Sequence, residues 1–132
     1  MNLKNIIQYI IKKYSPNEIS VIEIIKLLYI INKEYERKFN KILLDYNFEK
    51  IPIIGIYSKD LEKDLYHINN VNIKEIKTNF GNRKRILTLE KDINIYENDF
   101  LNQIINKTKF LSYNELIRYI DDINQFKYKP KQ

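Results

Sequence analysis

The segment from residue 22 to residue 31 most constrains what this chain can fold into. It reads Ile-Glu-Ile-Ile-Lys-Leu-Leu-Tyr-Ile-Ile, so a helix of this sequence is apolar nearly all round. Ser20 and Glu23 have the spacing of a capping box, in which each side chain satisfies a backbone N–H of the other residue. A helix that is apolar on most sides is buried on most sides. We therefore expect a central helix that begins after Ser20 and runs to about Lys38.

Four further helices are predicted, because apolar residues recur at steps of three and four. They are expected at residues 3–14, 58–69, 97–107 and 113–124. The first ends at Ser15-Pro16, since a residue before proline is pushed out of the helical region. Ser58 is expected to cap the second of them, and Ser112 with Glu115 repeats the capping-box spacing before the last.

Residues 73–89 carry the clearest β-signal. A run of apolar and charged residues precedes Asn79-Phe80-Gly81-Asn82, and a second run extends from Arg83 to Leu89. Gly and Asn readily adopt positive φ, which tight turns between strands require. We expect an antiparallel hairpin here. Residues 42–57, which contain Pro52 and Gly55, predict an irregular link with one or two short edge strands.

The expected fold class is α+β, mainly α with a small β-hairpin. About five helices plus a two-stranded ribbon, in this order, are typical of a winged helix-turn-helix with the hairpin as its wing. The sequence departs from that pattern at the link between the second and third helices, which has about twenty residues where a compact motif has three or four. We expect one domain over residues 1–126 and a flexible basic tail at 127–132.

Several stretches resemble known families. Ile24-Ile-Lys-Leu-Leu-Tyr-Ile30 is similar to a helix of the Panacea-type, phage-associated antitoxin domains, and Gly55-Ile-Tyr-Ser-Lys-Asp-Leu61 looks like the stretch that opens their next helix. That second stretch, Leu87-Thr88 and residues 111–120 also resemble small archaeal winged-helix proteins. The resemblance covers about residues 20–120. The antitoxin branch implies neutralisation of a toxin protein, and the archaeal group implies transcription regulation.

The charge of the chain is concentrated in the predicted hairpin. The net charge is +6, and residues 73–91 hold six basic and two acidic side chains. A basic ribbon suits duplex DNA, because displaced counterions drive phosphate binding. Charged edges that prevent strand pairing, and a genome biased towards Ile, Lys and Asn codons, are alternative explanations. The expected nucleic-acid contacts are Lys74, Lys77, Phe80, Arg83, Lys84 and Arg85, with Arg37, Lys38 and Lys41 adding affinity.

The helix after Ser58 argues against sequence-specific reading of DNA. Its exposed positions are expected to hold Lys59, Asp60, Glu62, Lys63 and Asp64. Carboxylates meet phosphates unfavourably, and base readout typically uses Arg, Lys, Asn or Gln. Binding through the hairpin would therefore have low specificity. Phe80 at the tip either wedges into a groove or rests on a partner, or it folds back on its own hairpin.

The chain holds eleven tyrosines. Four of them flank the central helix and the link, and we expect a protein interface there: Tyr29, Tyr35, Tyr46 and Tyr57. Tyrosine has a large apolar ring with a polar tip, which suits interfaces as well as core edges. The interface would belong to a homodimer or to a partner protein.

Enzymatic and metal chemistry are not expected. The chain has no cysteine and a single histidine, His67, so thiolate sites, disulfides and multi-His metal sites are excluded. His67 is expected near the end of the third helix as a satisfied or solvent-facing side chain. We therefore expect no catalytic residue and no cofactor. No secretion signal or apolar run of roughly 18 residues is found, so a cytoplasmic protein without membrane contact is expected.

Two hypotheses for function follow. The first is a dimeric winged-helix transcription regulator that contacts duplex DNA through the hairpin. It depends on the expected fold and on the charge of residues 73–91. The second is an antitoxin-like or virus- or plasmid-encoded module that binds another protein and not DNA. It depends on the acidic third helix, the tyrosines and the resemblance to antitoxin domains.

Overall fold

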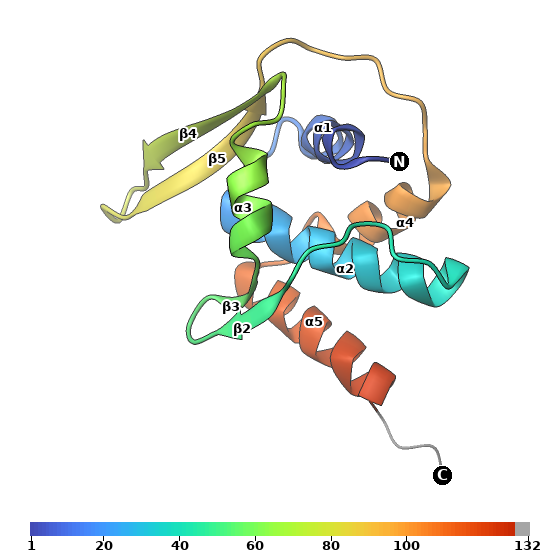
Figure 1. The fold of residues 1–132 in the computed structure, drawn as a ribbon. Coiled ribbons are helices and arrows are strands. Elements are labelled where there is room, and N and C mark those ends of the chain that lie inside the picture. Colours follow the sequence, from blue (N-terminus) through green and yellow to red (C-terminus); the bar gives the residue numbers. More distant parts are fainter. Residues whose placement is uncertain (129–132) are drawn as a thin grey trace.

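The structure is a computed structural model that describes residues 1–128, with side chains described as far as residue 124. Within that part the chain forms five helices and two small antiparallel sheets (Figure 1). The helices are α1 (Leu3–Tyr14), α2 (Val21–Phe39), α3 (Lys59–Leu65), α4 (Asp99–Thr108) and α5 (Tyr113–Tyr128). The strands are β1 (Ile19–Ser20), β2 (Glu49–Ile51), β3 (Gly55–Tyr57), β4 (Val71–Lys77) and β5 (Arg83–Leu89). The expected α+β class is confirmed.

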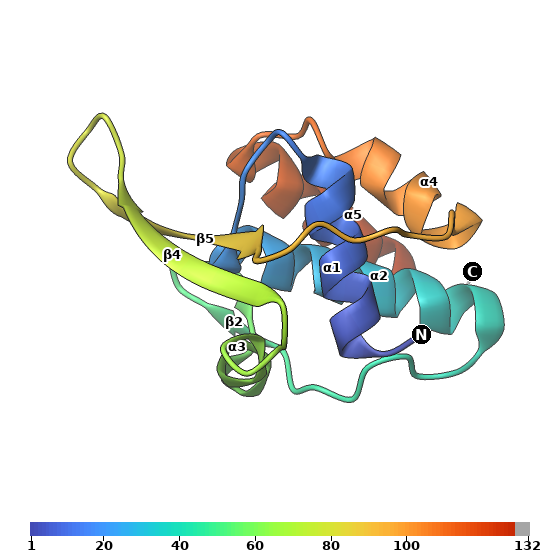
Figure 2. The same cartoon turned by 90° about the horizontal axis from the view of Figure 1, so that it is seen from above.

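Helix α2 lies at the centre of the molecule, as its apolar sequence predicts. Every residue from Ile24 to Ile31 is buried. All four other helices and the sheet lie around it (Figures 1 and 2). The predicted capping box is present, since Ser20 Oγ accepts from the Glu23 N–H at 3.1 Å and Glu23 Oε1 accepts from the Ser20 N–H at 3.3 Å. Local sequence therefore determines where this central helix starts.

The predicted hairpin is present, and a third strand joins it. Strand β5 pairs with β4 on one side and with β1 on the other, so the sheet order is β1-β5-β4. Leu87 of β5 faces Ile73 of β4 and Ile19 of β1 across the two pairings. Because β1 directly precedes α2, it fixes the base of the hairpin to the start of the central helix. The outer half of β4 and β5 extends away from the helices (Figure 2).

The link between α2 and α3 contains the second sheet. Strands β2 and β3 pair from Glu49 opposite Tyr57 to Ile51 opposite Gly55, in agreement with the expected short strands. The turn between them holds Ile53 in the left-handed region at φ 73°, with the side chain 98% exposed. This conformation is rare for a β-branched residue.

The C-terminal ends of two helices differ from the expectation. Helix α3 ends at Leu65, so His67 lies in the exposed turn that follows and not within the helix. Asn70 in the left-handed region at φ 68° then turns the chain into β4. Helix α5 continues past the expected end at Asn124 to Tyr128, and residues 129–132 of the expected tail lie outside the described part. No helix within that part combines the length and the apolar character needed to cross a bilayer.

Lys26 is a charged side chain that is fully buried in the core. Its Nζ donates to the Ile56 carbonyl at 3.2 Å and lies 5.2 Å from the centre of the Tyr113 ring. The Tyr113 hydroxyl in turn donates to the Ile54 carbonyl at 2.6 Å. One residue of α2 and one of α5 thus hold the backbone on both sides of Gly55. Burial lowers the pKa of Lys26 to about 8, against the opposing effect of Glu23.

We predict that Lys26 makes the stability of the protein rise with pH above about 8. The unfolded chain has an ordinary lysine pKa near 10.4, so between these values it binds more protons than the folded chain. Urea unfolding at pH 7.5 and pH 10 should show that wild type gains about 2 kcal/mol relative to Lys26→Met over this interval. The exposed Lys4→Met variant should keep the wild-type rise. Parallel pH curves for wild type and Lys26→Met would contradict the prediction.

Candidate nucleic-acid interface

The tip of the β4–β5 hairpin presents an exposed aromatic ring. The Asn82 carbonyl accepts from the Thr78 N–H at 2.7 Å, and the Thr78 carbonyl accepts from the Gly81 N–H at 3.0 Å. Gly81 has φ +82°, a conformation that favours glycine. Phe80 is 91% exposed, so it does not fold back on the hairpin. The ring is therefore accessible to a partner, as one of the two expectations for it requires.

The pairing register divides the hairpin cations between two faces. Lys77 lies opposite Arg83 and Glu75 lies opposite Arg85, so these four side chains share one face. Lys74 and Lys84 lie opposite isoleucines and point to the other face. The charge therefore surrounds the hairpin instead of forming a single stripe.

Three of the hairpin cations contact carboxylates of the chain itself. Arg83 pairs with Glu75 of the same hairpin at 3.2 Å. Lys84 lies 3.4 Å from Glu23 at the start of α2, and Arg85 lies 2.5 Å from Glu62 of α3. The sequence interpretation treated all three as available to phosphates, because their partners are distant in the sequence or on the opposite strand. In the structure Lys84 and Arg85 reach carboxylates outside the hairpin, whereas the partner of Arg83 lies within it.

Arg85 is the most strongly held of these side chains. Its Nη1 donates to the Tyr66 hydroxyl at 2.6 Å, and its side chain is only 37% exposed. Burial alone would lower the pKa of Arg85, but hydrogen bonds with Glu62, Tyr66 and Tyr57 raise it above its ordinary value. The same contacts tie β5 to α3. Arg85 is thus a structural link between these two elements.

The carboxylates of α3 are largely engaged as well. Glu62 binds Arg85, and Asp64 accepts from the Tyr46 hydroxyl at 2.6 Å. Burial, followed by the hydrogen bond to Asp64, raises the pKa of Tyr46. Lys59, Asp60 and Lys63 are exposed. Of the three carboxylates of α3, Glu62 is therefore paired with a cation of the hairpin, whereas Asp60 and Asp64 are exposed.

The outer hairpin cluster consists of Lys74, Lys77, Phe80 and Arg83. Lys74 and Lys77 are exposed, and no ion pair involves either of them in the part of the chain with described side chains. Arg83 is 80% exposed despite its contact with Glu75. This cluster contains the expected hairpin contacts that are exposed.

The second group of expected contacts lies elsewhere. Arg37, Lys38 and Lys41 are at the C-terminal end of α2, whereas the hairpin base meets its N-terminal end (Figure 1). From Glu23 to Arg37 the helix rises about 20 Å at 1.5 Å per residue. Arg37 pairs with Glu34, and the Lys38 amine lies 5.5 Å from the centre of the Phe39 ring. The structure does not bring this group together with the hairpin.

Two of the four tyrosines expected at an interface are buried in the core. Tyr29 and Tyr57 are among its buried residues, and the Tyr29 hydroxyl donates to Asn124 Oδ1 at 2.6 Å. Tyr35 is half-buried against the rings of Phe39 and Phe100, and Tyr46 is half-buried beside Asp64. The expectation is therefore corrected for Tyr29 and Tyr57, because both rings are covered by the chain itself.

Exposed apolar side chains occur instead at positions that the sequence interpretation did not select. Ile53 at the β2–β3 turn, Tyr96 before α4 and Phe110 after it are all largely exposed. Pro52 and Gly55 did predict an irregular link here, but they did not indicate that the Ile53 side chain would be exposed. Within the described side chains, no group of three or more His, Asp or Glu residues is placed to hold a metal ion.

Comparisons of the chain with protein-family models, with curated proteins and with solved structures gave no match.

We predict that the half-buried ion pair of Arg85 couples more strongly than the exposed pair of Arg83. A double-mutant cycle with Arg85→Ala and Glu62→Ala should give a coupling free energy of about 1 kcal/mol, whereas Arg83→Ala with Glu75→Ala should give less than about 0.5 kcal/mol. Both follow from urea unfolding of the single and double variants. Equal coupling in the two cycles would mean that Arg85 does not link β5 to α3.

Proposed function

We propose that the chain is a winged-helix module. The support is the element order α1-β1-α2-α3-β4-β5 together with the sheet order β1-β5-β4. In this assignment β4 and β5 form the wing, and α3 occupies the place of the recognition helix. The β2–β3 hairpin is then an insertion between the two helices that a compact helix-turn-helix joins by a short turn.

We further propose that the module binds duplex DNA through the outer hairpin cluster. The observation that carries this proposal is that Lys74, Lys77 and Arg83 are exposed on the hairpin that carries Phe80 at its tip and extends beyond the helices. Cations on such a projection contact phosphates on binding and release counterions. An exposed apolar ring at the tip is suited to insertion into a minor groove.

The proposed DNA binding has low sequence specificity. Helix α3 is short, and its exposed positions hold two lysines and two aspartates with few groups that read base edges. Contacts of the hairpin with phosphates position a protein on DNA but carry no sequence information. A role in transcription regulation would therefore require a second copy or a partner that adds contacts.

We predict that the outer hairpin cluster carries the salt dependence of DNA binding. Titration of a random duplex at 50–200 mM salt should show binding by wild type that weakens as salt rises. Lys74→Ala combined with Lys77→Ala and Arg83→Ala should reduce the log–log slope by roughly 2–3, at about 0.9 per lost phosphate contact. The matched triple of Arg37→Ala, Lys38→Ala and Lys41→Ala, at the far end of α2, should leave the slope unchanged. If the triple variant of the hairpin kept the salt slope of the wild type, the proposal would be contradicted.

Removal of a negative charge from the hairpin should strengthen DNA binding. Glu75→Gln removes the carboxylate that contacts Arg83, so it leaves this cation free for phosphate. We predict a higher affinity for the same duplex and a slightly steeper salt slope. Glu36→Gln, an exposed carboxylate near the distant end of α2, is the control and should change neither quantity. Equal affinity of Glu75→Gln and wild type would show that Arg83 takes no part.

A protein-binding module is the second candidate. It is favoured by the two exposed apolar residues at hairpin turns, Phe80 and Ile53, and by the neutralisation of Lys84 and Arg85 within the chain. The same titration separates the two candidates, because a protein-binding module predicts no duplex binding even at low salt. An antitoxin-like partner would then be sought with wild type and with Phe80→Ala, which should lose the complex.

A further inference from the structure

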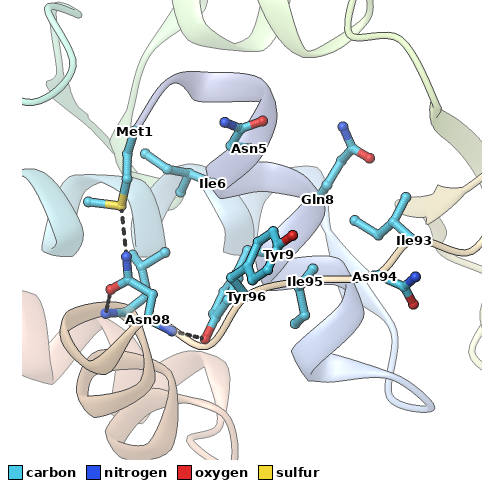
Figure 3. Close-up of a pocket in the computed structure, with 11 residues that line it drawn as sticks. Met1, Asn5, Ile6, Gln8, Tyr9, Ile93, Asn94, Ile95, Tyr96 and Asn98 are labelled. Carbon is cyan, nitrogen blue, oxygen red and sulfur yellow. Dashed lines mark hydrogen bonds between the residues drawn. The ribbon is translucent and has the colours of Figure 1, made fainter.

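A pocket of about 500 Å³ lies between the start of α1, the segment 93–98 and the start of α4. Figure 3 shows the side chains around it, which come from these three parts of the chain. Small-molecule sites in proteins usually have volumes of roughly 300–1,000 Å³. The pocket lies apart from the outer hairpin cluster, so an inference from it does not depend on the proposed DNA binding.

The lining of this pocket contains no charged side chain. Its buried wall includes Ile6 and Leu101, and Ile93 and Ile95 are half-buried beside them. The neighbouring lysines of α1 are engaged, since Lys12 pairs with Asp92 and Lys13 pairs with Glu97. A ligand that carries phosphate or carboxylate groups would find no lysine or arginine side chain in the lining. The chemistry favours a neutral ligand with a large apolar or aromatic surface.

Side-chain amides supply the polar part of the pocket. Asn98 is committed to the fold, because its Oδ1 caps α4 by accepting from the Leu101 N–H at 2.9 Å. Gln8 uses its Oε1 to accept from Asn70 at 3.1 Å, and its own N–H groups donate to no other described side chain. The amides of Asn5 and Asn94 have no hydrogen-bond partner among the side chains described. Free amides offer donors and acceptors side by side.

The ring of Tyr96 completes the site. It lines the pocket and is 96% exposed, so almost none of its surface packs against the protein. Planar bases stack on exposed aromatic side chains and pair their edges with Asn or Gln amides. We propose that this pocket binds a neutral purine base or nucleoside, with Tyr96 stacking on the base and the amides of Gln8 and Asn94 recognising its edge.

The proposal is tested with adenosine as the probe, by calorimetry and by amide chemical shifts of the whole protein. We expect saturable binding with shift changes in residues 5–9 and 93–98. Tyr96→Ala should weaken it about tenfold, which is typical of the loss of one stacked base. Tyr96→Phe keeps the ring and should retain the wild-type affinity. Phe110→Ala, which removes an exposed ring elsewhere, should also leave the affinity unchanged.

The ligand class has its own test. Adenosine monophosphate should bind more weakly than adenosine, because its phosphate meets no lysine or arginine side chain in the lining. Asn94→Ala should weaken adenosine binding, whereas Asn114→Ala on α5 should not. Tighter binding of the monophosphate, an unchanged affinity in Tyr96→Ala, or no binding at millimolar adenosine would each overturn the proposal.

Discussion

The burial of residues 24–31 in the first part of α2 is the constraint on which the rest of the structure depends. Because residues 24–31 are buried throughout, each neighbouring element has to turn apolar side chains towards this helix. The charged group that α2 brings into this region is the Lys26 amine, which needs acceptors there. It finds the carbonyl of Ile56, and through it the β2–β3 hairpin is held against the helix. The start of α3 at Ser58 follows directly, so the buried lysine helps to place the third helix.

The charges of the hairpin serve two roles that depend on which carboxylates the fold brings near them. On β5, Lys84 and Arg85 reach carboxylates of α2 and α3, and the half-buried setting of Arg85 makes its ion pair more than a surface contact. On β4, Lys74 and Lys77 are exposed and form no ion pair among the described side chains. Two strands of similar composition thus combine structural ion pairs on β5 with solvent-facing cations on β4.

Local signals in the sequence predicted the elements well. The capping boxes at Ser20 and Ser112, and the Gly81 turn, act over a few residues, and the structure contains all three. Strand β1 was missed because two residues show no periodicity. The ion pairs of Arg85 and Lys84 were missed for another reason, since Glu62 and Glu23 are brought close only by the fold. The burial of Tyr29 and Tyr57 also depends on contacts that no local pattern reveals.

The same difference between local and tertiary information changes what the net charge means. The sequence gives residues 73–91 an excess of four positive charges, but the fold leaves three cations exposed in the outer hairpin cluster. Three phosphate contacts correspond to a salt slope of only about −2.7, so a single hairpin holds DNA weakly at physiological salt. When two copies are linked, the second contact becomes an intramolecular event, and the affinity can rise by a factor of about 10²–10⁴. If the proposed DNA binding is to be strong, it therefore requires a second copy or an added partner that supplies further phosphate contacts.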